Sequence, residues 1–255
     1  MTYRLENQHA IVTGASRGIG AAIATVLAGA GVRVSLLARD GARLGDLAGQ
    51  LGAHAAAFAA DVADAASVAS AFAAARERFG PVGILINNAG QAASAKFTDT
   101  DATLWNRILA VNLTGTYQCT RAAVPDMLER GGGRIVNIAS IAGLRGGAYL
   151  SAYVTSKHAV VGLTRALALE YATRNITVNA VCPGYVDTDM VRKAVDNISR
   201  KTGRSEAEAR ATLVATNPQG RLVTADEVAH TTLWLCQEAS GSITGQSVVL
   251  AGGEL

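Results

Sequence analysis

The chain of 255 residues is long enough for one large or two small domains, and no proline-rich, serine-rich or charged linker divides it. Its hydrophobic content of 49% and charged content of 17% suit a compact fold and argue against a disordered chain. The net charge is only +3, without a long basic run, so nucleic-acid binding is not expected.

The first predicted element is the short apolar run 9–13, which ends in the segment Thr13-Gly14-Ala15-Ser16-Arg17-Gly18-Ile19-Gly20. Apolar residues then recur with the spacing of one helix face. The order strand, glycine turn, helix is typical of a dinucleotide site, in which the helix N-terminus faces the pyrophosphate. We expect Gly14 to permit a tight turn, Gly18 a close approach of backbone to phosphate, and Gly20 close helix packing. A glycine turn that binds nothing is the alternative.

Six further strand-like runs follow, at 32–37, 55–59, 84–86, 134–138, 176–181 and 246–250, and helical segments separate most of them. Such alternation predicts a parallel sheet with helices on both faces and a ligand across the carboxyl ends of the strands. The expected fold class is α/β, a doubly wound, Rossmann-type three-layer fold with a seven-stranded parallel sheet in a single domain, 1–255. The run 55–59 is the weakest, because alanine favours helices.

A tyrosine and a lysine stand four residues apart, as Tyr153 and Lys157, in a segment that reads as a helix after Ser151. Residues four apart share a helix face, so the phenol and the ammonium would project into one space. A cation about 4 Å away, at an effective dielectric of about 20, contributes about 4 kcal/mol, or about three pKa units. We therefore predict that the pKa of Tyr153 is lowered toward neutrality, where a general acid or base works best. An incidental surface pair is the alternative.

The chain carries further motifs in a fixed order: Asp61-Val62, Asn87-Asn88-Ala89-Gly90, Asn112, Ser140 and Pro183-Gly184. With the glycine turn and the Tyr153/Lys157 pair, these residues resemble the short-chain dehydrogenase/reductase family, in its single-domain branch, from residue 9 to residue 253. The resemblance implies an NAD(P)-dependent oxidoreductase that interconverts a carbonyl and a secondary alcohol by hydride transfer. It also implies a homotetramer formed through long helices, which would here be 104–128 and 152–171.

The resemblance assigns catalysis to Asn112, Ser140, Tyr153 and Lys157. Tyr153 would protonate the developing oxyanion, and Ser140 would hydrogen-bond the same oxygen. Lys157 would lower the pKa of the tyrosine and hold the nicotinamide ribose. Asn112 would position a water that links Lys157 to solvent; the alternative is that it only caps or kinks its helix.

The glycine turn and the resemblance together imply a set of cofactor-binding residues. Asp61 and Val62 would lie beside adenine, the backbone of 88–90 would line the adenosine ribose, and Val186 and Thr188 would face the nicotinamide carboxamide. The alternative for 87–90 is that these residues only stabilise the end of a central strand. The expected cofactor-binding residues are Gly14, Ser16, Arg17, Gly18, Ile19, Gly20, Arg39, Asp61, Val62, Asn88, Ala89, Gly90, Tyr153, Lys157, Pro183, Gly184, Val186 and Thr188.

The choice between NAD(H) and NADP(H) depends on the end of the second strand. An acidic residue there binds the ribose hydroxyls of NAD, whereas an arginine pairs with the extra phosphate of NADP. By similarity to the family, the position that is usually acidic in NAD users is Ala38 here, and Arg39 follows it; Arg17 is a second candidate. We therefore predict NADP(H). The NAD(H) alternative has Asp40 turning inward to the ribose and Arg39 stacking on adenine or facing solvent.

The segment 186–221 is expected to form a substrate lid. An anionic carrier, coenzyme A or acyl carrier protein, would suit its basic excess; a solvated amphipathic lid explains the excess equally well. Residues 189–221 contain seven basic and four acidic side chains. The basic residues are Arg192, Lys193, Arg200, Lys201, Arg204, Arg210 and Arg221, and the acidic ones are Asp189, Asp196, Glu206 and Glu208.

The chain is similar both to bacterial 3-oxoacyl reductases and to 3-hydroxybutyrate-type dehydrogenases. The predicted reaction is therefore NADPH-dependent reduction of a 3-oxoacyl thioester, carried on coenzyme A or acyl carrier protein. NAD-dependent oxidation of a 3-hydroxy acid, a 3-hydroxyacyl-CoA or another secondary alcohol is the alternative. One departure from the family is Ala251, where an acidic residue often precedes the glycines 252 and 253. The departure puts subunit contacts at this end in doubt.

Two other protein classes are disfavoured. A noncatalytic NADP(H)-sensing protein on the same fold would be expected to lack a catalytic residue, and none is missing. A hydrolase that used Ser140 would need a GxSxG elbow, which the sequence lacks.

Cysteine and histidine usage gives no sign of a metal site. Cys119, Cys182 and Cys236 are odd in number and widely spaced, so we expect reduced structural thiols. The four histidines show no ligand spacing. No apolar run is long enough to span a membrane, and residues 1–8 lack the apolar core of a signal peptide, so we expect a cytoplasmic protein with no membrane partner.

Overall fold

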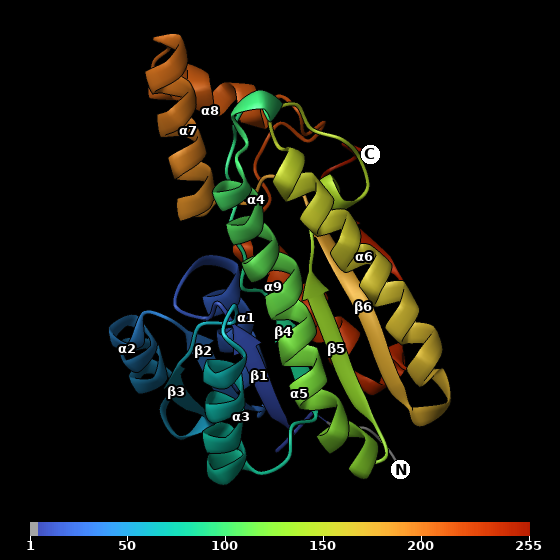
Figure 1. Cartoon of the computed structure of the whole chain (residues 1–255). Coiled ribbons are helices and arrows are strands. Elements are labelled where there is room, and N and C mark those ends of the chain that lie inside the picture. The colour runs from blue at the N-terminus through green and yellow to red at the C-terminus, as the bar shows by residue number, and fades with distance from the viewer. Residues whose placement is uncertain (1–4) are drawn as a thin grey trace.

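A seven-stranded parallel sheet forms the centre of the computed structural model, which describes residues 5–255 (Figure 1). The strand order is β3-β2-β1-β4-β5-β6-β7. It reverses between β1 and β4, and in doubly wound sheets ligands bind in the crevice at that point. The fold class and the strands expected from the sequence are confirmed. The strands are β1 (His9–Thr13), β2 (Arg33–Ala38), β3 (Ala55–Ala59), β4 (Ile84–Asn87), β5 (Gly133–Ile138), β6 (Ile176–Pro183) and β7 (Ser247–Leu250).

Helices cover both faces of the sheet. On one face lie α1 (Gly18–Gly29), α2 (Gly41–Leu51) and α9 (Ala225–Cys236), which share a hydrophobic cluster with the strands. The other face is covered by α3 (Ala65–Phe79), α5 (Gly115–Glu129) and α6 (Ser151–Tyr171). The remaining helices lie toward the carboxyl ends of the strands: α4 (Ala102–Leu109), α7 (Asp189–Thr202) and α8 (Glu206–Val214).

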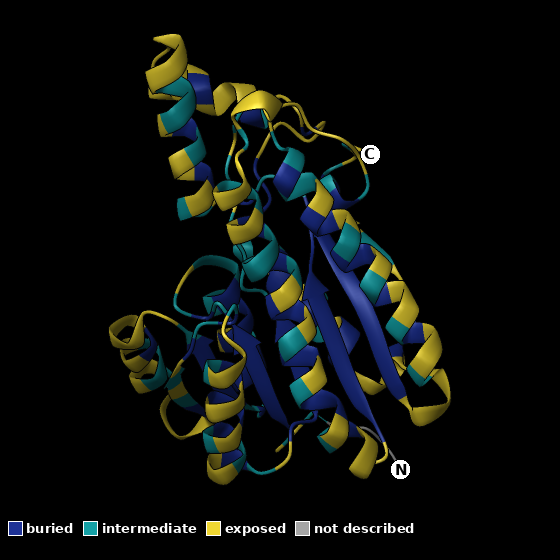
Figure 2. Ribbon diagram, viewed as in Figure 1, coloured by how far each residue is buried: buried dark blue, intermediate teal, exposed yellow. Residues whose placement is uncertain are grey.

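The side chains of the central strand β1 divide between the two clusters. Ala10 and Val12 pack on the α1 side, and Ile11 packs on the α5 side, because successive side chains of a strand point to opposite faces. Every residue of β1 is buried. Figure 2 shows the same pattern for the whole molecule, with buried central strands and helices that expose their outer faces. A strand that is covered on both faces has a nearly continuous run of apolar residues, and this run allowed β1 to be predicted from the sequence.

The long helix expected at 104–128 is present as a continuous helical run from 102 to 129, and it contains one distortion that was not expected as a π-helical turn. A π-helical turn, Ala110–Thr114, separates α4 from α5. Asn112 lies at its centre, and the hydroxyl of Thr116 donates a hydrogen bond to the Asn112 carbonyl at 2.8 Å. Such single turns widen a helix locally and frequently mark functional sites. The second expected helix, 152–171, corresponds to α6.

The expected lid at 186–221 contains α7 and α8, which extend beyond the sheet (Figure 1). These helices enclose a small apolar cluster of their own, which we call the lid cluster: Val191, Val195, Ala209, Leu213 and Leu222. Three of the seven basic residues pair with carboxylates: Arg192 with Asp189, Arg210 with Asp187, and Arg221 with Glu227. Part of the basic excess therefore serves the lid itself.

Three further findings concern residues 5–255. None of their helices combines the length and the apolar character needed to cross a membrane. Cys119, Cys182 and Cys236 are all buried and free, as expected. Within the same range, no group of three or more His, Cys, Asp or Glu side chains is placed to hold a metal ion.

Candidate active site

The glycine turn lies between β1 and α1, at the carboxyl edge of the sheet. Gly14 and Gly18 have φ values of +65° and +56°, in the region that only glycine adopts readily. A Cβ on Gly14 would lie 2.9 Å from the Cα of Ala89, and one on Gly20 would collide with the Gly14 carbonyl and the Asn88 side chain. The tight turn expected at Gly14 and the close packing expected at Gly20 are therefore both present.

Asn88 ties this turn to the end of β4. Its side-chain amide donates to the carbonyls of Thr13 and Gly14, at 2.9 and 3.2 Å. The backbone N–H groups of Asn88 and Ala89 both donate to the Thr13 hydroxyl at 3.0 Å. Asn87 is buried and donates to Thr120 and Asn137. The side chains of 87 and 88 and the N–H groups of 88 and 89 thus stabilise the strand ends, as the alternative for 87–90 expected.

The N-terminus of α1 is suited to a phosphate. Its N-cap residue, Arg17, makes no side-chain capping bond, whereas α2, α3, α4, α8 and α9 each begin with a capping side chain. The N–H groups of a first helical turn need such a partner, and an anion supplies one. A Cβ on Gly90 would lie 3.5 Å from the Asn112 side-chain oxygen and 3.7 Å from the Lys157 nitrogen. Gly90 therefore lies in contact with the catalytic side chains, and the uncapped first turn of α1 fits a phosphate group.

Basic side chains gather around the end of β2 and the start of α2, next to the glycine turn. The Asp40 carboxylate caps α2 by accepting from the Arg43 N–H at 3.2 Å, and it lies 3.4 Å from the Arg43 guanidinium. The carboxylate is therefore engaged by the first turn of α2 and by the Arg43 side chain. Arg39 is exposed beside it. Arg17 is exposed as well, 3.8 Å from Asp189 at the start of α7.

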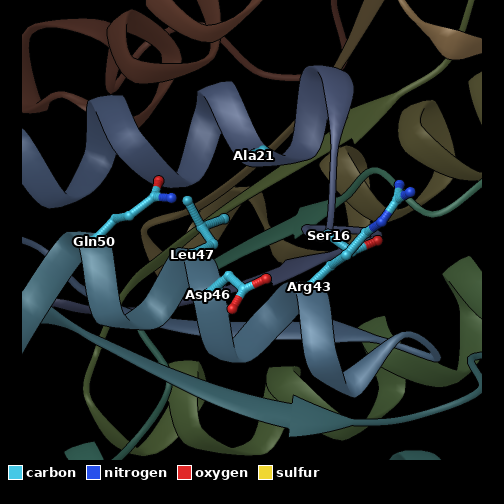
Figure 3. Close-up of a pocket in the computed structure, with 6 residues that line it drawn as sticks. All are labelled: Ser16, Ala21, Arg43, Asp46, Leu47 and Gln50. Carbon is cyan, nitrogen blue, oxygen red and sulfur yellow. The ribbon is translucent and has the colours of Figure 1, made fainter.

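Arg43 was missed in the sequence analysis. It extends from α2 toward Ser16 of the glycine turn, across a pocket between α1 and α2 (Figure 3). The other residues lining this pocket are Ala21, Asp46, Leu47 and Gln50. The available signal was the position of Arg43 three residues after Asp40, on the same face of a helix that begins there.

Asp61, Val62 and Ile19 border the same region. The Asp61 carboxylate accepts from the Ala63 N–H at 3.0 Å, which fixes the turn after β3. Val62 is buried against Gly115, where a Cβ would come within 2.7 Å of the valine methyl group. Ile19 packs against the α1-side cluster. These contacts hold the three side chains in the segments that follow β1 and β3.

Tyr153 and Ser140 meet at the carboxyl end of β5. Ser140 begins a short 3₁₀ turn by accepting from the Ala142 N–H at 3.1 Å, and its hydroxyl also hydrogen-bonds the Tyr153 phenol. Burial raises the pKa of Tyr153, and the Ser140 hydrogen bond opposes that shift. The expectation of a lowered pKa is therefore wrong for this structure, because burial outweighs the groups that favour the phenolate.

Lys157 is buried and turned toward the sheet. Its ammonium donates to the Ile138 carbonyl at 2.8 Å and lies 5.8 Å from the centroid of the Tyr153 ring. Burial lowers the pKa of Lys157 to about 8. The expected shared space is present, since both side chains project from one face of α6.

Asn112 links three segments around this centre. Its side chain donates to the Gln91 carbonyl and the Ser156 hydroxyl, each at 2.9 Å, and accepts from the Gln91 N–H at 2.8 Å. Asn112 also occupies the π-helical turn, so the kink that the sequence analysis left as an alternative is present. The water-positioning role stays a prediction.

The segment at the end of β6, residues 183–188, completes the candidate active site. Gly184 N–H donates to Leu250, and Val186 pairs with Val223, so residues 183–188 are anchored between β7 and the base of the lid. Val186 is buried, and the Thr188 hydroxyl donates to the Val186 carbonyl at 3.1 Å. Tyr185 follows Gly184 and is half-buried. The structure thus brings the glycine turn, the Ser140–Tyr153–Lys157 centre and residues 183–188 to one edge of the sheet.

The chain is similar to known dehydrogenases and reductases in both sequence and structure. A family model described as short chain dehydrogenase matches residues 8–199. The chain is 38% identical to D-beta-hydroxybutyrate dehydrogenase of Rhizobium meliloti over 96% of this chain and 97% of that protein. It is also 38% identical to 2-(S)-hydroxypropyl-CoM dehydrogenase 3 of Xanthobacter autotrophicus, over 99% and 98%. A crystal structure of a variant actinorhodin polyketide ketoreductase with NADPH matches with a TM-score of 0.94 and 38% identity, over 100% of this chain and 99% of that one.

Proposed function

This chain belongs to the short-chain dehydrogenase family, and from that premise we propose that it is an NADPH-dependent reductase of a 3-oxoacyl thioester carried on coenzyme A or acyl carrier protein. As a member of the family it is an oxidoreductase that acts on secondary alcohols and ketones. The observation that carries the proposal is the Tyr153 phenol, hydrogen-bonded to Ser140 beside the buried ammonium of Lys157.

Each catalytic side chain has a defined task in the reducing direction. Bound NADPH supplies the hydride that reduces the carbonyl carbon. Tyr153 donates its phenolic proton to the carbonyl oxygen, and its raised pKa keeps that proton in place at neutral pH. Ser140 hydrogen-bonds the same oxygen as negative charge develops on it. The Lys157 ammonium stabilises the resulting phenolate, an interaction that is strong in a buried site.

The glycine turn, the residues after β3 and β4, and residues 183–188 would hold the cofactor. The preference for NADPH is supported by the engagement of Asp40 at the start of α2, by Arg43, which lines the pocket with Ser16, and by the exposed Arg17 and Arg39. An arginine at this position pairs with the 2′-phosphate that distinguishes NADP from NAD.

The thioester assignment rests on the lid. Lys193 and Lys201 are exposed on α7, and neither takes part in the ion pairs that hold the lid together. They would therefore be available to the phosphates of an anionic carrier. The name of the Rhizobium relative favours a second candidate, the NAD-dependent oxidation of a free 3-hydroxy acid.

A homotetramer is part of the same proposal. Large apolar side chains are exposed on the outer faces of two helices: Tyr117 at 49% on α5 and Leu169 at 83% on α6. Exposed apolar residues on neighbouring helices suit a subunit interface. Light scattering would give the mass in solution, and a monomeric mass for the unmodified protein would contradict this assignment.

A spectrophotometric substrate panel tests the function directly. The panel contains acetoacetyl-CoA, longer 3-oxoacyl thioesters, acetoacetate and simple ketones, each with NADPH and with NADH. We expect the highest kcat/KM for a thioester with NADPH. Preferred oxidation of 3-hydroxybutyrate with NAD would favour the second candidate, and inertness toward every carbonyl, with NADPH bound, would overturn the enzymatic assignment.

A further inference from the structure

The segment after β7 turns back toward the catalytic centre through two glycines. Gly252 and Gly253 have φ values of +60° and +95°, both in the region that favours glycine. A Cβ on Gly252 would also collide with the side chain of Asn217, which lies between α8 and α9. Glu254 N–H then donates to the Ala251 carbonyl at 3.1 Å and closes the turn. These conformations direct the Glu254 side chain back toward the end of β6.

Glu254 forms an ion pair with Arg145, in the loop that leads from Ser140 to α6. The side chain of Glu254 is only 4% exposed, whereas that of Arg145 is 43% exposed. A buried carboxylate requires a charged partner, since an unpaired buried charge is strongly unfavourable. Arg145 therefore fixes the position of Glu254, and the pair joins two segments 109 residues apart.

The Arg145–Glu254 pair borders Tyr185. A carboxylate oxygen of Glu254 lies 3.3 Å from the position of a Cβ on Gly184, the residue before Tyr185. Both charges act on the Tyr185 phenol: burial raises its pKa, Glu254 raises it further, and Arg145 opposes the shift. Tyr185 is also among the groups that raise the pKa of Tyr153. The Tyr185 phenol is therefore within electrostatic reach of both the ion pair and the catalytic phenol.

Two further contacts define the place of Tyr185. Its carbonyl accepts from the Val223 N–H at 2.9 Å, at the base of the lid. Its side chain packs against the lid cluster. Tyr185 thus contacts the lid cluster, and the residue before it, Gly184, lies against Glu254 of the ion pair.

We propose that Arg145 and Glu254 are a positioning pair that fixes Tyr185 as the substrate-facing wall between Tyr153 and the lid, and that Tyr185 thereby determines which carbonyl substrates are accepted. The proposal rests on the proposed function, because it needs Tyr153 as the proton donor to the substrate. The proposal adds Tyr185 as a residue that determines specificity. It also explains the turn at Gly252 and Gly253, which brings Glu254 to Arg145.

The test uses the full-length protein and three variants. Glu254→Gln removes the charge and keeps the shape of the side chain. The double variant Arg145→Glu/Glu254→Arg restores a pair with reversed charges. Asp126→Asn is the matched control, since Asp126 forms another partly buried ion pair, with Arg76, between α3 and α5. For each protein, kcat and KM are measured with the best thioester of the panel and with a small ketone, and the Kd of NADPH is measured by fluorescence.

We expect Glu254→Gln to raise KM for the thioester roughly tenfold or more, as the loss of one partner of a buried charge pair implies. The ratio of kcat/KM between the two substrates should change, while kcat for the small ketone and the Kd of NADPH stay close to those of the unmodified protein. The double variant should recover most of the lost selectivity, and Asp126→Asn should keep the original ratio. An unchanged ratio in Glu254→Gln, or an equal loss for both substrates together with weaker NADPH binding, would overturn the proposal.

Hydrogen exchange distinguishes failure of this proposal from failure of the proposed function. The amides of Gly184, Asp187 and Val223 are hydrogen-bonded around Tyr185. If the unmodified protein binds NADPH and reduces no carbonyl, the proposed function fails. Faster exchange at 184–188 in Glu254→Gln, reversed in the double variant, would still support the positioning pair. Unchanged exchange would overturn it.

Discussion

The ammonium of Lys157 donates to the carbonyl of Ile138 over 2.8 Å, and this bond holds the cation at the end of β5. The hydroxyl of Ser140, two residues further along the chain, opposes the rise that burial causes in the pKa of Tyr153. The tyrosine and the lysine thus share one helix face but have different hydrogen-bond partners. Their roles can be tested separately.

Tyr153→Phe should abolish carbonyl reduction while leaving the Kd of NADPH unchanged. The phenol donates the proton, and general acid catalysis typically contributes about 10²- to 10⁴-fold to the rate. Stopped-flow turnover and fluorescence titration measure the two effects. Tyr149→Phe is the control, because Tyr149 is 64% exposed and should tolerate the change. Near-normal turnover in Tyr153→Phe would remove the phenol from the mechanism.

The alkaline limb of the pH–rate profile should report Lys157. Its pKa of about 8 means that it is charged below that pH and neutral above it. Because the charged form stabilises the phenolate, kcat/KM for reduction should fall as the pH rises through about 8. In Lys157→Arg the guanidinium stays charged throughout, so the fall should disappear even if the rate is lower. The same inflection in both proteins would assign the titration to another group.

Folding stability should decrease in mild acid because of His9. This buried ring lies between the Gly80 carbonyl at 2.7 Å and the Ser35 hydroxyl at 2.8 Å, and burial lowers its pKa from 6.5 to about 4. Between those two values the unfolded chain binds a proton that the folded chain does not. The free energy of unfolding should therefore fall by about 3 kcal/mol as the pH drops from about 6.5 to about 4.

Urea denaturation at several pH values measures this effect. His9→Gln should lack this part of the pH dependence, although it starts from a lower stability. His230→Gln should retain the dependence of the unmodified protein, because His230 is exposed. Identical slopes in all three proteins would show that His9 is not responsible.

Arg39→Ala and Arg43→Ala should each reduce the preference for NADPH over NADH. A hydrogen bond to a charged group contributes about 1.5 to 3 kcal/mol, which corresponds to roughly ten- to a hundred-fold in kcat/KM for NADPH. Arg78→Ala is the control, since Arg78 lies over the Phe79 ring on α3. Comparable efficiency with NADH in the unmodified protein, or an unchanged ratio in both variants, would argue against NADP(H).

The strands and the glycine turn were predictable because their signals are local. β1 is a run of buried residues that continues directly into Gly14, and β3 was found despite its alanines. The π-helical form of the turn at Asn112 could not be read from the sequence, because the partners of that side chain, Gln91 and Ser156, are 21 and 44 residues away.

The electrostatics of the site were harder to predict than its composition. Sequence spacing correctly placed Tyr153 and Lys157 on one face of α6, but the direction of the Tyr153 pKa shift depends on burial, which spacing does not report. The pairing of Arg145 with Glu254 has no sequence signal either, because it depends on how the segment after β7 folds back.

The lid cluster is separate from the two clusters that cover the sheet. Its five members, Val191, Val195, Ala209, Leu213 and Leu222, pack among themselves and with neighbours in the same part of the chain. Natural variation in these side chains can therefore reshape the substrate entrance at little cost to the sheet that carries the hydride chemistry. We expect the lid to be exchangeable between relatives as a unit, with the thermal stability of the chimera as the measurement.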